Sequence, residues 1–330
     1  MQKISIIGGA GFIGTNLCQR LADRQIPFEI VDLKQSRRFP EKTRIADIRD
    51  KAALAQALTG NLVVNLAAVH TDDASDPSAY ETTNVDGTHN IAELCADRGI
   101  SRIVFTSTVA VYGFAPVGTG ENGAINPFNE YGRTKWRAEE VLDAWHRADP
   151  ENRALMVVRP TVVFGEGNRG NVFNLLNQIA SGRFMMIGDG TNSKSMAYVG
   201  NVVAFLDACI HSDRTRGTFN YVDTPDTDMN ALVTLVRGKL KGTPNVGPRL
   251  PRWLGLAIGH LFDAVARLTG KRFPISAIRV TKFTAASSFA SAKDELDSFT
   301  PPFTLEEGLE RTLQAEFIAP DPAREIFYTE

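Results

Sequence analysis

The sequence has little cysteine, and this scarcity excludes two common ways of stabilising a fold. Only Cys18, Cys95 and Cys209 occur among its 330 residues, and they are widely spaced, odd in number and never arranged as Cys-x-x-Cys. A disulfide framework and a structural zinc site are therefore not expected, and a reducing compartment such as the cytoplasm suits the chain. The five histidines do not cluster, so we expect no metal site.

Long apolar runs and an excess of one charge are missing as well. No run reaches the roughly 20 apolar residues that a membrane-spanning helix needs, and the first residues enter a strand pattern without the regions of a signal peptide. The formal net charge is only −2, so no overall field draws the protein to nucleic acid. These absences predict a cytoplasmic protein that binds no nucleic acid.

The first half of the chain contains a regular alternation of strand and helix patterns. Continuous runs of Val, Ile, Leu and Phe predict buried strands at 4–7, 28–33, 62–68, 102–108 and 154–160. Helix patterns lie between them, at 12–24, 51–58, 84–98 and 131–147. This alternation predicts an α/β fold, namely a Rossmann-type doubly wound parallel sheet with crossover helices.

The alternation becomes irregular after Phe164, where a loop rich in glycine and asparagine follows at 165–171. We therefore expect a first domain at 1–165 and a second, smaller α/β domain at 166–330. The chain is expected to return to the first domain around 196–222.

The first strand–helix junction, GGAGFIG at 8–14, has the glycine spacing of a dinucleotide-binding turn. Gly9, Gly11 and Gly14 fit the pattern G-x-G-x-x-G, and Gly8 starts the wider spacing G-x-x-G-x-x-G. Glycine permits a tight turn in which backbone N–H groups approach a pyrophosphate at a helix N-terminus. A purely structural turn is the alternative, but the strand before it and the helix after it favour a cofactor site.

Asp32 ends the second predicted strand and indicates which dinucleotide binds. A carboxylate there accepts hydrogen bonds from both ribose hydroxyls and repels a 2′-phosphate, which favours NAD over NADP. Arg37 and Arg38 follow closely and weaken this preference. Asp47 either reaches the adenine amino group or caps the helix that follows it.

In the segment YGRTK at 131–135 a tyrosine stands four residues before a lysine. On a helix this spacing places Tyr131 and Lys135 on one face. Many surface helices carry such a pair, so by itself it is weak evidence for chemistry.

Six segments together resemble the extended short-chain dehydrogenase/reductase family, which includes sugar-nucleotide epimerases and dehydratases. In the order and spacing of that family they are GGAGFIG (8–14), NLAA (65–68), NVDGT (84–88), TSTVAVYG (106–113), YGRTK (131–135) and VRPTVVFG (158–165). Segments of the second half are similar to a narrower group of bacterial polysaccharide-pathway members, those acting on N-acetylglucosamine linked to polyprenyl diphosphate. These segments are 168–190, 194–205, 219–230 and 272–283.

The resemblance implies a role for each matching residue. Tyr131 is the acid/base, Lys135 lowers its pKa and holds the nicotinamide ribose, and Thr108 bonds the reacting sugar oxygen. Ser107 is the alternative to Thr108, and Asn84 supports the site. An N-cap of helix 84–98 is the structural alternative for Asn84 and is compatible with that role. The implied contacts to NAD are Gly8, Gly9, Gly11, Phe12, Ile13, Gly14, Asp32, Asp47, Ile48, Leu66, Ala67, Ala68, Tyr131 and Lys135.

Two departures from the family pattern carry information. Dehydratases have an Asp-Glu pair where this chain has Val109 and Ala110, so dehydration is disfavoured. Many UDP-sugar epimerases have an asparagine at the position of Val162, and an arginine at that of Lys194, which grip the diphosphate. We assign Arg169 and Lys194 to a diphosphate, with solvated surface charge as an equally good alternative for both.

The leading functional hypothesis is an NAD-dependent 4-epimerase of a polyprenyl-diphosphate- or UDP-linked N-acetylhexosamine, working through a 4-keto intermediate in O-antigen biosynthesis. The alternatives are an NAD(P)H-dependent 4-ketoreductase and a dinucleotide-binding sensor without activity. The resemblance also implies a homodimer through helices 84–98 and 131–147.

The segment 251–268 forms an amphipathic helix pattern too short and too charged to span a bilayer. Its apolar face is expected either to pack on the second domain or to lie in a membrane interface, with Trp253 near the headgroups and Arg252 and Arg267 toward anionic lipid. Packing is the commoner outcome, whereas a polyprenyl substrate favours the membrane.

Overall fold

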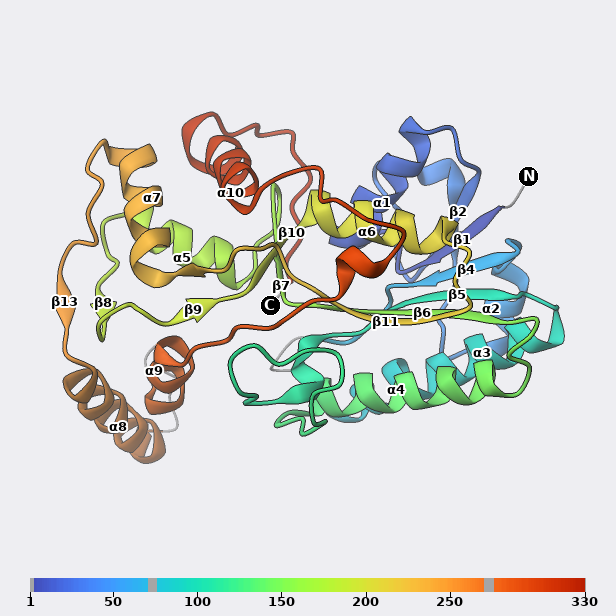
Figure 1. Ribbon diagram of the computed structural model, residues 1–330, viewed down its shortest axis with the longest axis horizontal. Helices are drawn as coiled ribbons and strands as arrows, with labels where there is room; N and C mark the ends of the chain where they lie inside the picture. Colours follow the sequence, from blue (N-terminus) through green and yellow to red (C-terminus); the bar gives the residue numbers. More distant parts are fainter. Residues whose placement is uncertain (1–2, 71–75, 270–275, 330) are drawn as a thin grey trace.

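The computed structural model describes residues 3–70, 76–269 and 276–329, and within them seven strands form one parallel sheet. The strands stand in the order β11-β6-β5-β4-β1-β2-β3 (Figure 1). Their bounds are β1 Ile4–Ile7, β2 Phe28–Asp32, β3 Thr43–Ile45, β4 Leu62–Asn65, β5 Arg102–Thr106, β6 Ala154–Pro160 and β11 Arg216–Tyr221. This is the predicted Rossmann-type architecture.

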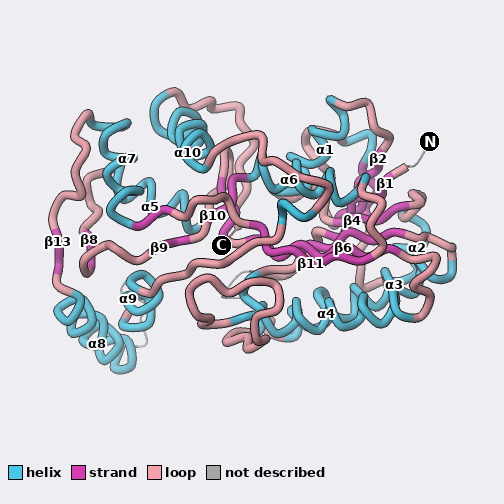
Figure 2. Tube along the Cα trace, in the orientation of Figure 1, coloured by secondary structure: helices cyan, strands magenta, loops and turns pink. Residues whose placement is uncertain are grey.

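Helices cover both faces of this sheet (Figures 1 and 2). One face carries α1 (Phe12–Asp23) and α6 (Val199–His211), and the other carries α2 (Lys51–Ala57), α3 (Gly87–Asp97) and α4 (Glu130–Arg147). Successive strand residues point to opposite faces, so Ile6 belongs to the core under α1 and α6 and Ile7 to the core under α2–α4. Burial on both faces explains why the strands are continuous apolar runs.

The position of β1 between β4 and β2 marks the point at which the strand order of the sheet reverses. Ile7, the last residue of β1, lies between Val31 of β2 and Asn65 of β4. Beyond these residues the chain leaves in opposite directions along the sheet, which is the position where doubly wound folds bind ligands. The glycine-rich turn and Asp32 lie at this edge.

The remaining elements form a smaller α/β part beside the sheet, on the left of Figure 1. Its strands come in short pairs, which are β7 Val162–Phe164 with β10 Met196–Tyr198, β8 Met186–Ile187 with β13 Arg249–Leu250, and β9 Ser193–Lys194 with β12 Thr227–Asp228. Its helices are α5 Asn171–Ala180, α7 Met229–Lys241, α8 Arg252–Thr269, α9 Ala277–Thr284 and α10 Leu305–Leu313.

Most element boundaries agree with the sequence patterns, and the exceptions have a local cause. The predicted strands 62–68 and 102–108 end earlier, at Asn65 and Thr106, because the chain there turns into the site. Helix 84–98 begins at Gly87 and is preceded by a π-helical turn over Tyr80–Asp86. Asn84 therefore lies inside helical structure, and its predicted role as an N-cap is wrong.

Helix α8 approaches the protein through its two glycines, Gly255 and Gly259, and through Asp263. Gly255 and Gly259 are buried, and a Cβ atom on Gly259 would lie 2.7 Å from the backbone nitrogen of Ala277. Asp263 accepts a hydrogen bond from the same Ala277 N–H at 3.1 Å. The expectation that the apolar face would be packed on the protein fails at Trp253, which is 70% exposed.

The outward side of α8 therefore carries large apolar side chains together with the exposed Arg252, His260 and Arg267. Leu261 is 64% exposed, and the half-buried Leu254, Ile258 and Val265 lie beside it. Among the described residues, no helix combines the length and the hydropathy that a bilayer span requires.

Candidate active site

The glycine-rich turn forms a cradle that leaves a helix N-terminus open. Gly8 has φ +79°, and a Cβ atom on it would lie 2.7 Å from the nitrogen of Ala67. A Cβ on Gly14 would lie 2.5 Å from the carbonyl oxygen of Gly8. A Cβ on Gly11 would meet only this oxygen, at 3.3 Å, so the described protein atoms constrain it least.

Gly11 is also the N-cap of α1, where no described side chain accepts a hydrogen bond from the first turn. The backbone N–H groups of Phe12, Ile13 and Gly14 are therefore free of side-chain caps and suit an anion such as a pyrophosphate. The residues present fit a dinucleotide.

The carboxylate of Asp32 lies at the second strand end beside this cradle. It accepts hydrogen bonds from the backbone N–H groups of Ala10, at 2.9 Å, and Lys34, at 3.0 Å. A carboxylate has about four lone-pair sites, so two remain for ribose hydroxyls. Arg37 and Arg38 are exposed.

Asp47 and its neighbours line the same edge. Its carboxylate binds Arg49 at 2.6 Å, and this guanidinium lowers the pKa of Asp47. Asp50 rather than Asp47 caps α2, so the capping alternative for Asp47 is wrong. Ile48 is buried, and the half-buried residues 66–68 follow β4 next to Gly8.

Tyr131 and Lys135 lie on one face of the first turns of α4, as predicted. Asn129 caps this helix by accepting a hydrogen bond from the Gly132 N–H at 2.9 Å. Burial raises the pKa of the Tyr131 phenol to about 12, while the hydrogen bond it shares with Thr108 lowers that pKa. The structure thus brings Tyr131 and Thr108 into direct contact.

Lys135 is only 2% exposed, and its ammonium nitrogen lies 4.1 Å from the ring centre of Phe105. Burial lowers the pKa of Lys135 to about 7, and the nearby carboxylate of Glu139 raises it in part. Lys135 is thus a desolvated lysine, one turn of α4 after Tyr131.

Below this pair lies a buried ion pair that the sequence patterns did not indicate. Arg159 in β6 donates two hydrogen bonds to Glu139 in α4, with lengths of 2.9 and 2.5 Å. Ser107 donates to the same carboxylate at 2.5 Å, so its hydroxyl serves the ion pair and is not placed beside Tyr131 as a fallback for Thr108. Glu139, four residues after Lys135 on the same helix face, was the available sequence signal.

Asn84 joins the strand-end loop to α4. Its side chain accepts a hydrogen bond from the N–H of Val69 at 2.8 Å, and donates to the carbonyl of Val69 and to the hydroxyl of Thr134, both at 3.0 Å. Since Thr134 is adjacent to Lys135, Asn84 fixes the loop after β4 against α4. These contacts are structural, and they are compatible with the supporting role that the resemblance implies for Asn84.

The two basic residues assigned to a diphosphate are both engaged with the protein. Arg169 binds Glu316 at 2.7 Å and lies over the ring of Phe173. The ammonium of Lys194 donates to the carbonyls of Lys282, at 3.0 Å, and Ala285, at 2.5 Å.

These two carbonyls belong to the C-terminal end of α9, so Lys194 acts as a cap for that helix. Among the described residues no carboxylate pairs with Lys194, and burial lowers the pKa of this lysine. Its charge is therefore not neutralised by the part of the chain that the structure describes.

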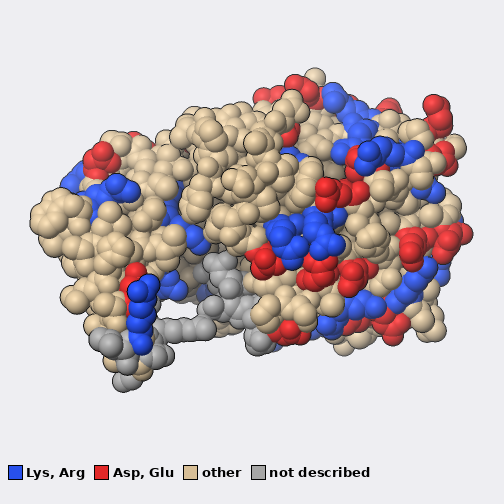
Figure 3. All heavy atoms as spheres, turned by 90° about the horizontal axis from the view of Figure 1, so that it is seen from below, with Lys and Arg blue, Asp and Glu red and all other residues tan. Residues whose placement is uncertain are grey.

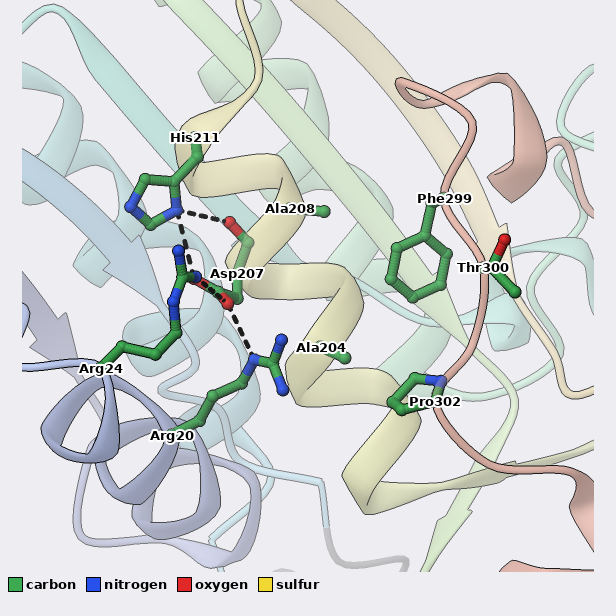
Figure 4. A pocket seen from close by; sticks show the side chains of 9 residues that line it. All are labelled: Arg20, Arg24, Ala204, Asp207, Ala208, His211, Phe299, Thr300 and Pro302. Atoms are coloured by element: carbon green, nitrogen blue, oxygen red, sulfur yellow. Dashed lines mark hydrogen bonds and ion pairs between the residues drawn. The ribbon is translucent and has the colours of Figure 1, made fainter.

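A pocket between α1, α6 and the segment 299–302 lies away from these residues (Figure 4). There the buried Asp207 binds Arg20 at 2.8 Å, Arg24, and the Nδ1 atom of His211 at 3.1 Å. Arg20 lies in the last turn of α1, opposite the glycine-rich end. The pocket contains none of the predicted site residues, and its charges fasten α1 to α6.

Comparisons with known proteins agree with this geometry. Residues 4–221 match the family described as NAD dependent epimerase/dehydratase. The chain is 47% identical over 320 residues, 96% of either chain, to the N-acetyl-alpha-D-glucosaminyl-diphospho-ditrans,octacis-undecaprenol 4-epimerase of Escherichia coli O157:H7. It is 28% identical over 345 residues, 95% of either chain, to the UDP-glucose 4-epimerase of Vibrio cholerae.

Solved structures share the fold. The UDP-N-acetylglucosamine 4-epimerase from Bacillus cereus matches with a TM-score of 0.74 over 94% of this chain and 98% of that chain, at 17% identity. The Thermus thermophilus UDP-glucose 4-epimerase in complex with NAD matches with a TM-score of 0.71 over 94% and 98%, at 20% identity. At such identities the likeness concerns the fold, and it confirms the Rossmann-type architecture.

Replacing Asp32 tests the basis of cofactor choice. We expect Asp32→Asn to weaken NAD binding about 10- to 100-fold, because the ribose hydroxyls lose hydrogen bonds to a charged acceptor. The difference in affinity between NAD and NADP should become smaller, because the repulsion of the 2′-phosphate is relieved. The amide oxygen still accepts from Ala10, so the turn is kept. Fluorescence titration of cofactor-free protein measures both affinities. A wild type that binds NADP more tightly than NAD would show that Arg37 or Arg38 dominates.

Replacing Lys135 tests its desolvation. A lysine in the unfolded chain has a pKa of about 10.4, against about 7 for Lys135 in the fold. Between these two pH values the unfolded state binds a proton that the folded state has lost, so the free energy of unfolding of the wild type rises with pH. Below pH 7 the folded protein carries the full cost of burying the ammonium of Lys135. We expect Lys135→Met to raise the melting temperature of the cofactor-free protein at pH 6–7, by an amount that shrinks toward pH 10.

The matched control for this variant is Lys51→Met, because Lys51 is an exposed lysine paired with Glu93. It should give no gain in melting temperature at any pH. A Lys135→Met protein that is less stable than wild type at pH 6 would contradict the assignment of a desolvated ammonium.

Proposed function

The chain belongs to the NAD dependent epimerase/dehydratase family, and we propose that it is an NAD-dependent 4-epimerase of N-acetylglucosamine linked to polyprenyl diphosphate. The observation that carries the chemistry is the contact of Tyr131 with Thr108 above the buried Lys135. The substrate is supported by the relative with 47% identity, whose name specifies an N-acetylglucosaminyl diphosphoundecaprenol. Such a reaction belongs to surface polysaccharide biosynthesis, as in O-antigen assembly.

NAD bound at the glycine-rich turn and Asp32 would supply a reversible hydride acceptor for carbon 4 of the sugar. Tyr131 takes the proton of the 4-hydroxyl and gives it back after the 4-keto sugar has turned over. Thr108 holds the same oxygen. Lys135 supplies the positive charge that lowers the pKa of the phenol and holds the nicotinamide ribose.

The side chains next to Thr108 limit what else the site does. Val109 and Ala110 carry no acid or base, so water is not eliminated across carbons 5 and 6. We assign Arg169 and Lys194 to the substrate diphosphate, which supplies the negative charge that Lys194 lacks within the described structure. The exposed Val162 offers the diphosphate no hydrogen bond.

The test is incubation of the purified protein with polyprenyl-diphosphate-linked and UDP-linked N-acetylglucosamine separately, with the sugar products resolved. We expect N-acetylgalactosamine from the polyprenyl-linked substrate without net oxidation of reduced cofactor. Stoichiometric consumption of NADH with a 4-keto sugar would identify a 4-ketoreductase instead. Binding of NAD without any turnover would identify a sensor.

Tyr131→Phe separates proton transfer from folding. The ring is kept, so the variant should fold and bind NAD, but it loses the hydroxyl that moves the proton. Loss of a general acid/base typically lowers turnover about 10²–10⁴-fold. Thermal unfolding, NAD titration and the product assay measure the three properties. Near-normal turnover would remove Tyr131 from the mechanism.

We also propose that the outward side of α8 lies in a membrane interface. A polyprenyl substrate stays in the bilayer, so the enzyme must reach the membrane surface. Trp253 and Leu261 are large apolar side chains exposed on this helix. Arg252 and Arg267 are exposed on it and complement anionic headgroups.

We expect the wild type to sediment with anionic liposomes, and Trp253→Glu with Leu261→Glu to abolish this at unchanged melting temperature, because both side chains are exposed. The control Ile45→Glu with Ile318→Glu changes two exposed residues elsewhere and should still sediment. If the wild type stays in the supernatant, or if α8 instead mediates self-association in a liposome-free sedimentation run, the membrane proposal fails.

The family resemblance further supports a homodimer through α3 and α4, which lie side by side on the outer face of the sheet (Figure 1). Analytical ultracentrifugation gives the oligomeric state directly.

A further inference from the structure

The loop between Gly113 and Phe128 carries an aromatic pair that is left open to solvent. The rings of Phe114 and Phe128 stack with centroids 4.7 Å apart, yet these side chains remain 61% and 47% exposed. Val117 in the same loop is exposed as well. Exposed large apolar side chains that cluster in this way typically mark a binding surface.

The loop is held in place by the second half of the chain. Gly118 donates a backbone hydrogen bond to the carbonyl of Ser288 at 2.9 Å, and Ala290 donates to the carbonyl of Thr119 at 3.1 Å. Phe289, between them, is buried against Tyr112. The exposure of the aromatic pair therefore belongs to an anchored conformation.

The neighbouring helix α9 extends this surface. The ammonium of Lys282 lies 4.9 Å from the ring centre of Phe128. Ile278 is exposed and stands four residues before Lys282, so both lie on one face of α9. We call the set Phe114, Val117, Phe128, Ile278 and Lys282 the aromatic ledge.

The aromatic ledge adjoins both the catalytic and the diphosphate residues. Phe128 precedes Tyr131 by three residues, and Phe114 follows the short helix that begins directly after Thr108. On the other side, Lys194 binds the backbone carbonyl of Lys282. A substrate with its sugar at Tyr131 and its diphosphate at Lys194 would carry its next group onto the ledge.

We propose that the aromatic ledge binds the first isoprene units of the polyprenyl diphosphate, an inference that rests on the proposed function. The apolar rings contact the isoprene units. Lys282 contacts the end of the polyprenyl chain that is attached to the negatively charged diphosphate. The loop 113–128, α9 and α8 lie along the lower side of the molecule in Figure 1, so a polyprenyl chain bound to the ledge would continue toward α8. Figure 3 views this side, where charged side chains are denser over the half that carries α3 and α4.

The test uses water-soluble N-acetylglucosaminyl diphosphates whose second ester is methyl, citronellyl with two isoprene units, or phytanyl with four. For the wild type we expect kcat/KM to rise about three- to tenfold per isoprene unit over the first two units, since each buried methylene favours binding. The gain should lie mainly in KM, because the hydrocarbon binds equally in ground and transition states.

In the double variant Phe114→Ser with Phe128→Ser, the ratio of kcat/KM for the citronellyl ester to that for the methyl ester should fall at least tenfold. Activity on the methyl ester itself should stay at the wild-type level. Ile278→Ser, a change on α9, should lower the same ratio by a smaller factor. The control Ile45→Ser with Ile318→Ser changes two exposed residues elsewhere and should keep the wild-type ratio. These side chains are exposed, so all variants should retain the wild-type melting temperature.

Three results would overturn the inference. A wild type that turns over all three esters equally, or a double variant that keeps the wild-type chain-length dependence, removes the ledge from chain binding and leaves the epimerase function intact. A double variant that loses activity equally on the methyl ester and on UDP-N-acetylglucosamine assigns the rings to another part of the substrate. If the wild type epimerises none of the diphosphates, the proposed function itself fails.

Discussion

The buried ion pair between Glu139 and Arg159 is the interaction on which the active site depends. It joins helix α4 to strand β6, and through Ser107 it also holds the end of β5. Removing one partner of such a pair typically costs about 3–5 kcal/mol, because the other charge stays buried. Thr108 follows Ser107 directly, and Lys135 stands one turn before Glu139. The ion pair thus sets the distance between the strand end and the helix that bring Thr108 and Tyr131 together.

The parts of the fold and site that the sequence predicts are those determined by short-range patterns. The strand Ala154–Pro160 is fully apolar on both faces except for Arg159, and its bounds were predicted without error. The glycine-rich turn is recognisable because backbone contacts at Gly8 and Gly14 leave no room for a side chain. Tyr131 and Lys135 share a face because helical periodicity fixes their separation.

The parts that could not be predicted depend on contacts between distant segments. The partner of Ser107 is 32 residues away, and the two carbonyls that hold Lys194 belong to a helix about 90 residues further on. The role of Asn84 follows from a π-helical turn, which apolar periodicity does not indicate. For α8 the sequence predicts an amphipathic helix, but the side that packs depends on the close approach that Gly255 and Gly259 permit.

The orientation of α8 reverses the usual pattern of mutational tolerance for an amphipathic helix. In most such helices the large apolar residues resist change and small surface residues vary freely. Here a side chain at Gly259 would collide with the backbone of Ala277, and one at Gly255 would collide with Ile187. Trp253 and Leu261, in contrast, can be replaced by polar residues without loss of packing. Among natural variants of this chain, selection for folding would therefore act on the two glycines, and any restriction on Trp253 or Leu261 would reflect function alone.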